Sequence, residues 1–163
     1  MKTPKELFSN LIQIGMITDD AETTLRNLEE TLGMGPFRVV DYPPHDEPDC
    51  ERYLFDVPAD FTGKFCFFNC GNIEFEVIQP TGGENIWTDF LKKNKGPGLH
   101  HLKYMVQSHD EVREHFNRLG IKEVQSGASV GLNKGRSWSY YDTVDSIGFY
   151  TEVMNEKKRE ENT

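Results

Sequence analysis

The chain carries the same strand-and-helix pattern twice, and this repeat constrains the fold more than any other feature. Two stretches each place a polar residue inside an otherwise apolar strand: Asn10-Leu-Ile-Gln-Ile-Gly-Met-Ile17 and Gly96-Pro-Gly-Leu-His-His-Leu-Lys-Tyr104. The two polar residues, Gln13 and His101, lie 88 positions apart (101 − 13 = 88). An amphipathic helix is predicted after each strand, over 19–32 and 110–119. The repeat therefore predicts two similar modules that share one core.

Helix caps and further strands complete each module. Asp19-x-x-Glu22 and Ser108-x-x-Glu111 are N-terminal capping patterns. Alternating apolar segments predict further strands over 37–40, 52–57, 64–69 and 73–79 in the first module, and over 122–125, 137–141 and 149–154 in the second. We predict an α+β fold of two tandem βαβββ modules that form a curved mixed sheet around a metal site. Residues 1–163 are predicted to make one domain, with module one over about 10–80, a linker helix over about 84–95, module two over about 98–155 and a polar tail over 156–163.

The last strand of each module carries a glutamate on the face that is expected to point away from the module helix. Side chains alternate along a strand, so Glu74 and Glu76 share one face of 73–78, and Glu152 has the corresponding face of 149–154. A single histidine in a strand is ordinarily a core or surface residue. Here four candidate ligands fall at matching places in two repeats: Gln13, Glu76, His101 and Glu152, with Glu74 as the alternative to Glu76.

The chemistry of this set favours one divalent metal ion. One imidazole, one amide and two carboxylates suit Co, Mn, Ni, Zn or Mg. Iron oxygenases typically use two histidines and one carboxylate, and Gln13 breaks that pattern. The set instead favours Lewis-acid chemistry on a carbonyl compound, in which the metal lowers the pKa of an α-proton and carboxylates move that proton.

Charge and composition exclude several other classes of function. The net charge of −9 disfavours nucleic acid, because binding to a phosphate backbone calls for clustered Lys and Arg. No apolar run approaches the roughly 20 residues that span a bilayer, and the N-terminus lacks the apolar segment of a secretory signal. Cys50, Cys66 and Cys70 make an odd number without CxxC spacing, which fits a reducing compartment. We therefore expect a cytoplasmic protein without a membrane or nucleic-acid partner.

Four features in the middle of the chain form a distinctive pattern: Phe65-Cys-Phe-Phe-Asn-Cys-Gly-Asn72, Glu76 near Gln79-Pro80, Phe90-Leu-Lys-Lys-Asn-Lys95 and Gly98-Leu-His-His-Leu102. This pattern resembles that of the methylmalonyl-CoA epimerases of the vicinal oxygen chelate (glyoxalase/bleomycin resistance) superfamily. The likeness is strongest over residues 60–106 and is carried elsewhere by the two-module layout. It implies the fold of paired βαβββ modules and the metal ligands Gln13, Glu76, His101 and Glu152.

The resemblance also implies two bases that face opposite sides of a planar enolate. Asp60 stands where the epimerases have a catalytic glutamate, and Glu152, or water beside it, is the second base. The chain departs from the epimerase pattern at Gln13, where a histidine is usual, and at Asp60, which is one methylene shorter. It also departs in the aromatic run Arg136-Ser-Trp-Ser-Tyr-Tyr-Asp-Thr143, where a more aliphatic strand is expected.

We predict a metal-dependent epimerase or isomerase that acts α to a carbonyl, with an acyl-CoA such as methylmalonyl-CoA as the favoured small-molecule substrate. Two alternatives remain open: a glyoxalase I-like lactoylglutathione lyase, and a non-catalytic small-molecule-binding protein of the same fold. Metal content separates the binding protein from the enzymes. We also expect a homodimer.

Overall fold

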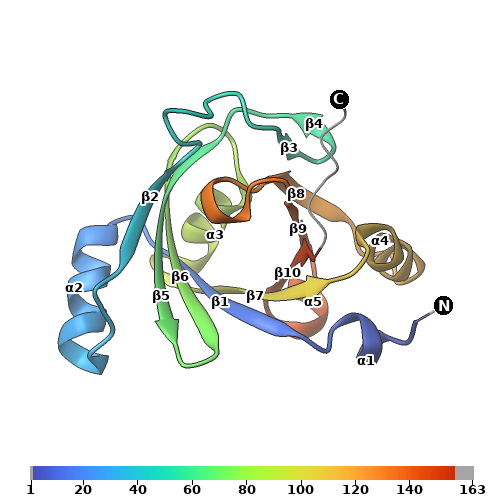
Figure 1. Ribbon diagram of the computed structural model, residues 1–163, viewed down its shortest axis with the longest axis horizontal. Coiled ribbons are helices and arrows are strands. Elements are labelled where there is room, and N and C mark those ends of the chain that lie inside the picture. The colour runs from blue at the N-terminus through green and yellow to red at the C-terminus, as the bar shows by residue number, and fades with distance from the viewer. Residues whose placement is uncertain (1, 157–163) are drawn as a thin grey trace.

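The strands form one curled sheet in the computed structural model of this chain, which describes residues 2–156 (Figure 1). The ten strands are β1 (Leu11–Ile17), β2 (Arg38–Tyr42), β3 (Arg52–Leu54), β4 (Val57–Pro58), β5 (Thr62–Cys70), β6 (Ile73–Gly82), β7 (Gly98–Val106), β8 (Glu123–Ala128), β9 (Ser137–Tyr141) and β10 (Tyr150–Asn155). The helices are α1 (Pro4–Leu7), α2 (Ala21–Leu32), α3 (Ile86–Asn94), α4 (His109–Arg118) and α5 (Val144–Ile147), with a 3₁₀ turn over Gly131–Asn133. The predicted α+β fold with a curved mixed sheet is confirmed.

The sheet consists of two halves with the same internal order. Its strand order is β2-β5-β6-β1-β7-β10-β9-β8-β3-β4. In each half the first strand pairs in parallel with the last: β1 with β6, and β7 with β10. An antiparallel pairing of β1 with β7 joins the two halves at the middle of the sheet. The first strands of both halves, which carry Gln13 and His101, are therefore direct neighbours.

The segment 52–57 differs from its prediction as one strand of the first module. Phe55 and Asp56 have positive φ angles of 50° and 62°, so the chain turns back there and β3 and β4 form a hairpin. This hairpin joins the second half, because β3 pairs antiparallel with β8. The alternation of apolar residues indicates a strand here, but it carries no information about which edge of the sheet the strand will extend.

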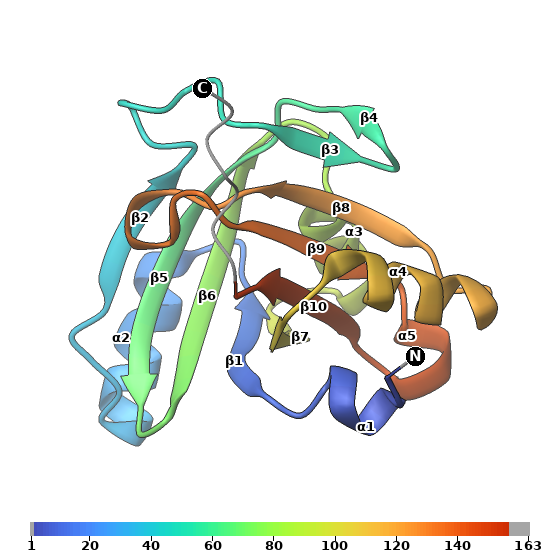
Figure 2. The ribbon, with the colours of Figure 1, turned by 45° about the vertical axis from the view of Figure 1, so that its right-hand side comes forward.

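Helices α2 and α4 cover the convex side of the sheet at opposite ends (Figure 2). Asp20 caps α2 by accepting a hydrogen bond from the backbone N–H of Thr23 at 3.0 Å, so this helix begins slightly later than predicted. Ser108 caps α4 as predicted, by accepting from the N–H of Glu111 at 3.3 Å. Apolar side chains of α2 pack on β5 and β6, and those of α4 on β7, β9 and β10. The concave side is left for the residues that alternate to the other face.

Two short helices, α1 and α5, were not predicted from the sequence. The predicted polar tail over 156–163 lies outside the described residues except for Glu156. Across residues 2–156, none of the helices has both the length and the apolar character that a membrane crossing requires.

Candidate metal centre

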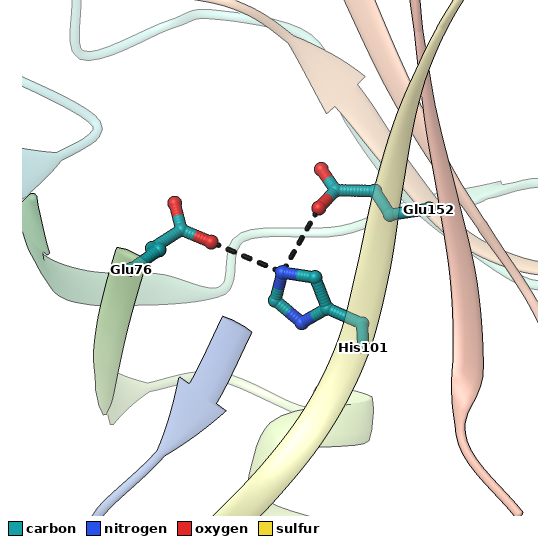
Figure 3. Close-up of side chains that lie close together, drawn as sticks. All are labelled: Glu76, His101 and Glu152. Atoms are coloured by element: carbon teal, nitrogen blue, oxygen red, sulfur yellow. Dashed lines mark hydrogen bonds and ion pairs between the residues drawn. The ribbon is translucent and has the colours of Figure 1, made fainter. Parts of the chain in front are cut away.

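Three of the four predicted ligands meet on the concave face of the sheet (Figure 3). His101 Nε2 lies 3.2 Å from Glu76 Oε2 and 3.1 Å from Glu152 Oε2. All three side chains are buried, with at most 3% of each residue exposed. One potential ligand atom from each residue lies within 4.8 Å of the others. Strands β6, β7 and β10 thus bring together residues that are far apart in the sequence.

A glycine makes this meeting possible. In the sheet Gly15 is the neighbour of Glu76 on one side and of His101 on the other. A Cβ atom on Gly15 would lie 1.8 Å from His101 Cε1 and 2.0 Å from Nε2. The imidazole ring therefore occupies the space above β1 that any side chain at this position would fill. Only a residue without a side chain lets His101 cross β1 towards Glu76.

Gln13 lies two residues before Gly15 on the same face and is 2% exposed. Its Nε2 donates a hydrogen bond to Glu74 Oε1 at 2.6 Å. Its Oε1 is buried and has no hydrogen-bond partner among the described residues. Gln13 therefore presents a free oxygen of the kind that binds a hard cation, while Glu74 lies outside the cluster of three ligands and contacts the amide instead.

Lys103 is a functional residue that the sequence analysis missed. It follows His101 by two residues, so it shares the ligand face, and it is only 8% exposed. Its Nζ lies 2.9 Å from Glu152 Oε1. Burial lowers the pKa of Lys103, but Glu152 and Glu76 raise it by more, so the ammonium is charged. The signal was present in the alternation, since a lysine on a buried face requires a carboxylate partner.

Glu152 uses its two oxygens differently. Oε1 faces Lys103, while Oε2 faces His101 and lacks a hydrogen bond within the described part of the chain. Burial raises the pKa of Glu152, but Lys103 and His101 lower it by more. The group is therefore an ionised carboxylate with one oxygen held by an ammonium and the other directed at the centre of the cluster.

His100 orients the ring of His101 from behind. The two Nδ1 atoms lie 2.9 Å apart, and the ring of His100 stacks on Tyr150 with centroids 4.5 Å apart. Burial, helped by His101, holds the pKa of His100 well below its usual value, so His100 is neutral. Burial also lowers the pKa of His101, but Glu152 and Glu76 raise it by more. A proton on His101 Nδ1 that is donated to His100 leaves Nε2 directed at the two carboxylates.

These residues fit a divalent cation. The cluster and its neighbours hold three carboxylates, Glu74, Glu76 and Glu152, against one ammonium on Lys103. The face therefore carries two uncompensated negative charges when His101 is neutral. Two buried oxygens, Gln13 Oε1 and Glu152 Oε2, lack hydrogen bonds among residues 2–156. An imidazole with carboxylate and amide oxygens matches the preferences of Mn, Co, Ni, Zn and Mg.

The ligand face forms the floor of a cavity of about 190 Å³ that is open to solvent. Gln13, Glu74, Glu76 and Lys103 supply its polar floor, and its walls include four aromatic side chains: Tyr42, Phe65, Phe67 and Trp138. An ion pair of 2.9 Å between Glu47 and Lys134 joins the loops of the two halves, and Glu47 itself lines the cavity. Asp60 does not lie with these groups. It is exposed in the segment before β5 and is not among the described residues that line the cavity, so its role as a base stays a prediction.

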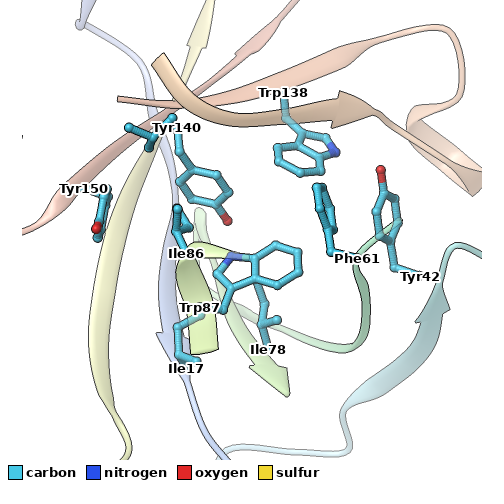
Figure 4. Close-up of a cluster of buried hydrophobic side chains, with 10 residues drawn as sticks. Ile17, Tyr42, Phe61, Ile78, Ile86, Trp87, Trp138, Tyr140 and Tyr150 are labelled. Atoms are coloured by element: carbon cyan, nitrogen blue, oxygen red, sulfur yellow. The ribbon is translucent and has the colours of Figure 1, made fainter. Parts of the chain in front are cut away.

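A packed aromatic cluster closes the concave face beside the cavity (Figure 4). Trp87 of α3 is fully buried, with its ring centroid 5.3 Å from Phe61 and 6.4 Å from both Trp138 and Tyr140. The ring of Tyr140 also lies 5.0 Å from that of His101. The predicted strand 137–141 thus contributes to both the cavity and the aromatic cluster. Trp138 lines the cavity, and Tyr140 packs between the aromatic cluster and His101.

Comparison with known proteins identifies the family of the chain. A sequence profile described as the "Glyoxalase/Bleomycin resistance protein/Dioxygenase superfamily" matches residues 12–140. The mitochondrial methylmalonyl-CoA epimerase of Mus musculus is 31% identical over 131 residues, which cover 80% of this chain and 65% of that protein. An ethylmalonyl-CoA/methylmalonyl-CoA epimerase of Cereibacter sphaeroides is 24% identical over 121 residues, which cover 74% of this chain and 78% of that protein. The chain thus matches somewhat less than two thirds of the mouse protein's length.

Solved structures share the fold at low identity. The methylmalonyl-CoA epimerase of Mycobacterium tuberculosis superposes with a TM-score of 0.62 at 16% identity. The superposition covers 96% of this chain and 93% of the epimerase chain. A methylmalonyl-CoA epimerase in complex with methylmalonyl-CoA and NH4+ superposes with a TM-score of 0.60 at 17% identity, covering 91% of this chain and 94% of its own.

Proposed function

The chain belongs to the glyoxalase/bleomycin resistance protein/dioxygenase superfamily, and we propose that it is a metal-dependent epimerase that moves a proton α to the carbonyl of an acyl-CoA. The observation that carries the proposal is the convergence of Glu76, His101 and Glu152 beside a cavity whose lining includes Glu76 and Gln13. The buried oxygen of Gln13 has no hydrogen-bond partner among the described residues. The similarity to epimerases that are named for methylmalonyl-CoA supports that compound as the first substrate to test.

The residues have distinct tasks in this proposal. Gln13, Glu76, His101 and Glu152 would hold the metal, and the metal would polarise the substrate carbonyl and stabilise the enolate. Glu152 moves the α-proton on one side, because its Oε2 is ionised and directed into the cluster. Lys103 keeps Glu152 ionised and in place through its contact with Oε1.

Two measurements test the proposal together. We expect about one divalent metal per chain by elemental analysis, and deuterium incorporation from heavy water at the α-carbon of methylmalonyl-CoA. His101→Ala and Glu152→Ala should lose both, whereas Glu84→Ala, at an exposed position, should keep both. Full metal content in the two ligand variants would refute the ligand assignment. Exchange in the glutathione hemithioacetal of methylglyoxal but not in methylmalonyl-CoA would favour the lactoylglutathione lyase.

The second base is a separate question. The resemblance to the epimerases implies Asp60, which is exposed, whereas Glu47 is part of the cavity lining. If Asp60 is the base, Asp60→Asn should keep the metal and slow α-proton exchange by about 10²- to 10⁴-fold, as expected for loss of a general base. Glu47→Gln is the matched comparison. Unchanged exchange in Asp60→Asn together with slow exchange in Glu47→Gln would transfer the role to Glu47.

The homodimer and the cytoplasmic location also remain predictions from the sequence. Sedimentation equilibrium of the purified protein measures the first, and fractionation of cells measures the second.

A further inference from the structure

The side-chain amide of Gln13 is held by a hydrogen bond at one end only. On β6 its neighbour in the sheet is Glu74, and on β7 its neighbour is Lys103. The Nε2 atom of Gln13 donates to Glu74 Oε1 at 2.6 Å, and all three side chains line the same cavity. The oxygen of the amide remains buried without a hydrogen bond from any described residue.

The two ends of an amide have opposite capacities, so its orientation decides whether it can bind a cation. The oxygen accepts and has lone pairs for a metal, whereas the NH2 group only donates and has none to offer. A carboxylate oxygen such as Glu74 Oε1 is an acceptor for the NH2 group of the amide. Rotation of the Gln13 amide by 180° would turn its oxygen towards the oxygens of Glu74 and its NH2 group away from them. The carboxylate of Glu74 therefore favours the orientation in which the NH2 group faces it and the oxygen points away.

We propose that Glu74 is a positioning residue that holds the amide of Gln13 with its oxygen available to the metal. The inference rests on the metal site of the proposed function and assigns to Glu74 a task that differs from ligation. Groups that hydrogen-bond to metal ligands commonly change metal affinity by about 10- to 100-fold when they are removed.

The positioning of Gln13 by Glu74 must be distinguished from a direct electrostatic effect, because the carboxylate of Glu74 could also attract the metal. A double-mutant cycle makes this separation. Charge acts on the metal whether or not Gln13 is present, whereas positioning acts only through Gln13. The four proteins are the wild type, Glu74→Ala, Gln13→Ala and the double variant, and Glu74→Gln serves as a conservative replacement that keeps an acceptor.

The experiment measures the Co²⁺ dissociation constant by competition with a chromogenic chelator, together with the visible absorption spectrum of the Co²⁺ protein. We expect Glu74→Ala to weaken binding by about 10- to 100-fold in the wild type. In the Gln13→Ala background the same change should weaken binding by less than about threefold, because only the charge effect remains. The Co²⁺ spectrum of Glu74→Ala should resemble that of Gln13→Ala, and Glu74→Gln should restore part of the affinity. Thermal unfolding with excess chelator checks that each variant folds.

The outcomes distinguish a failure of the positioning role of Glu74 from a failure of the proposed metal site. An equal loss of affinity in both backgrounds, or a Co²⁺ spectrum of Glu74→Ala identical to that of the wild type, would overturn the role of Glu74 and leave the metal site intact. Failure of the wild type to bind Co²⁺ or any other divalent metal would instead overturn the proposed function, and the inference about Glu74 with it.

Discussion

The two halves of the sheet carry very different residues at corresponding positions of their first strands. Two residues after Gln13 in β1 comes Gly15, and two residues after His101 in β7 comes Lys103. Gly15 leaves the space that the His101 ring occupies. Lys103 has a long side chain at the corresponding position, and its Nζ lies 2.9 Å from Glu152 Oε1. The first half therefore leaves space for the candidate ligand His101, and the second half supplies the ammonium that holds the candidate ligand Glu152.

This difference shows how a symmetrical backbone produces an asymmetrical site. The last strands place Glu76 and Glu152 at similar positions beside β1 and β7. Glu152 has a lysine ammonium as its partner, whereas Glu76 contacts His101, which is charged only when protonated. The two glutamates should therefore respond differently to the same substitution.

The largest expected effect comes from breaking the charged pair of the second half. Glu152→Ala leaves the ammonium of Lys103 buried without its partner, which costs about 3–5 kcal/mol of unfolding free energy. Glu76→Ala should cost less, because its histidine can remain neutral. Urea denaturation with excess chelator measures both. The double variant Glu152→Gln, Lys103→Met should recover most of the loss, and equal losses for the two single alanine variants would contradict the asymmetry.

The next effect comes from filling the space in the first half. Gly15→Ala places a methyl group within 2.0 Å of two His101 ring atoms, so the ring must move. Overpacking of this kind costs about 1–3 kcal/mol, and the displaced imidazole should no longer bind metal together with Glu76. Urea denaturation and elemental analysis measure the two consequences. Gly82→Ala, in the same sheet but with only the Thr62 hydroxyl nearby, is the control. Full metal content in Gly15→Ala would show that His101 does not need this space.

The smallest expected effect concerns pH, and we expect it to centre on His101 in the second half, because its counterpart Gln13 does not titrate. Burial lowers the pKa of His101, but Glu152 and Glu76 raise it by more. A raised pKa stabilises the folded protein fully below the unfolded value of about 6.5, and this stabilisation is lost as the pH rises through the folded value. With chelator present, unfolding free energy should therefore fall above about pH 6.5 in the wild type, but much less in His101→Gln.

With saturating Mn²⁺ or Zn²⁺, the fall in unfolding free energy above about pH 6.5 should become smaller or reverse. A metal competes with the proton at His101 Nε2, so the stabilisation by metal grows as the pH rises. Thermal unfolding from pH 6 to pH 9, with and without metal, measures both trends. Identical pH profiles for the wild type and His101→Gln under chelator would mean that His101 does not carry a raised pKa.

The sequence predicted the ligand-bearing strands well because their information is local. The repeat aligns Gln13 with His101, and alternation along each last strand places Glu76 and Glu152 on the inner face. The same alternation carried an unused signal for Lys103, since it shares a face with His101. Its partner could not be identified, because pairing with Glu152 depends on which strand lies beside β7. The role of Gly15 was hidden for the same reason: a glycine in a strand indicates close approach, but only the register identifies the approaching ring.

The β3–β4 hairpin has a consequence for association between molecules. Without it, β8 would be an edge strand of six residues with unpaired backbone groups, the kind of surface through which sheets of different molecules join. The first half of the chain covers that edge with β3, and β4 then ends the sheet with two residues, one of them Pro58, which lacks a backbone N–H. The early part of the sequence thereby protects the later part from edge-to-edge aggregation, so the second half produced alone would expose β8 to other copies of itself.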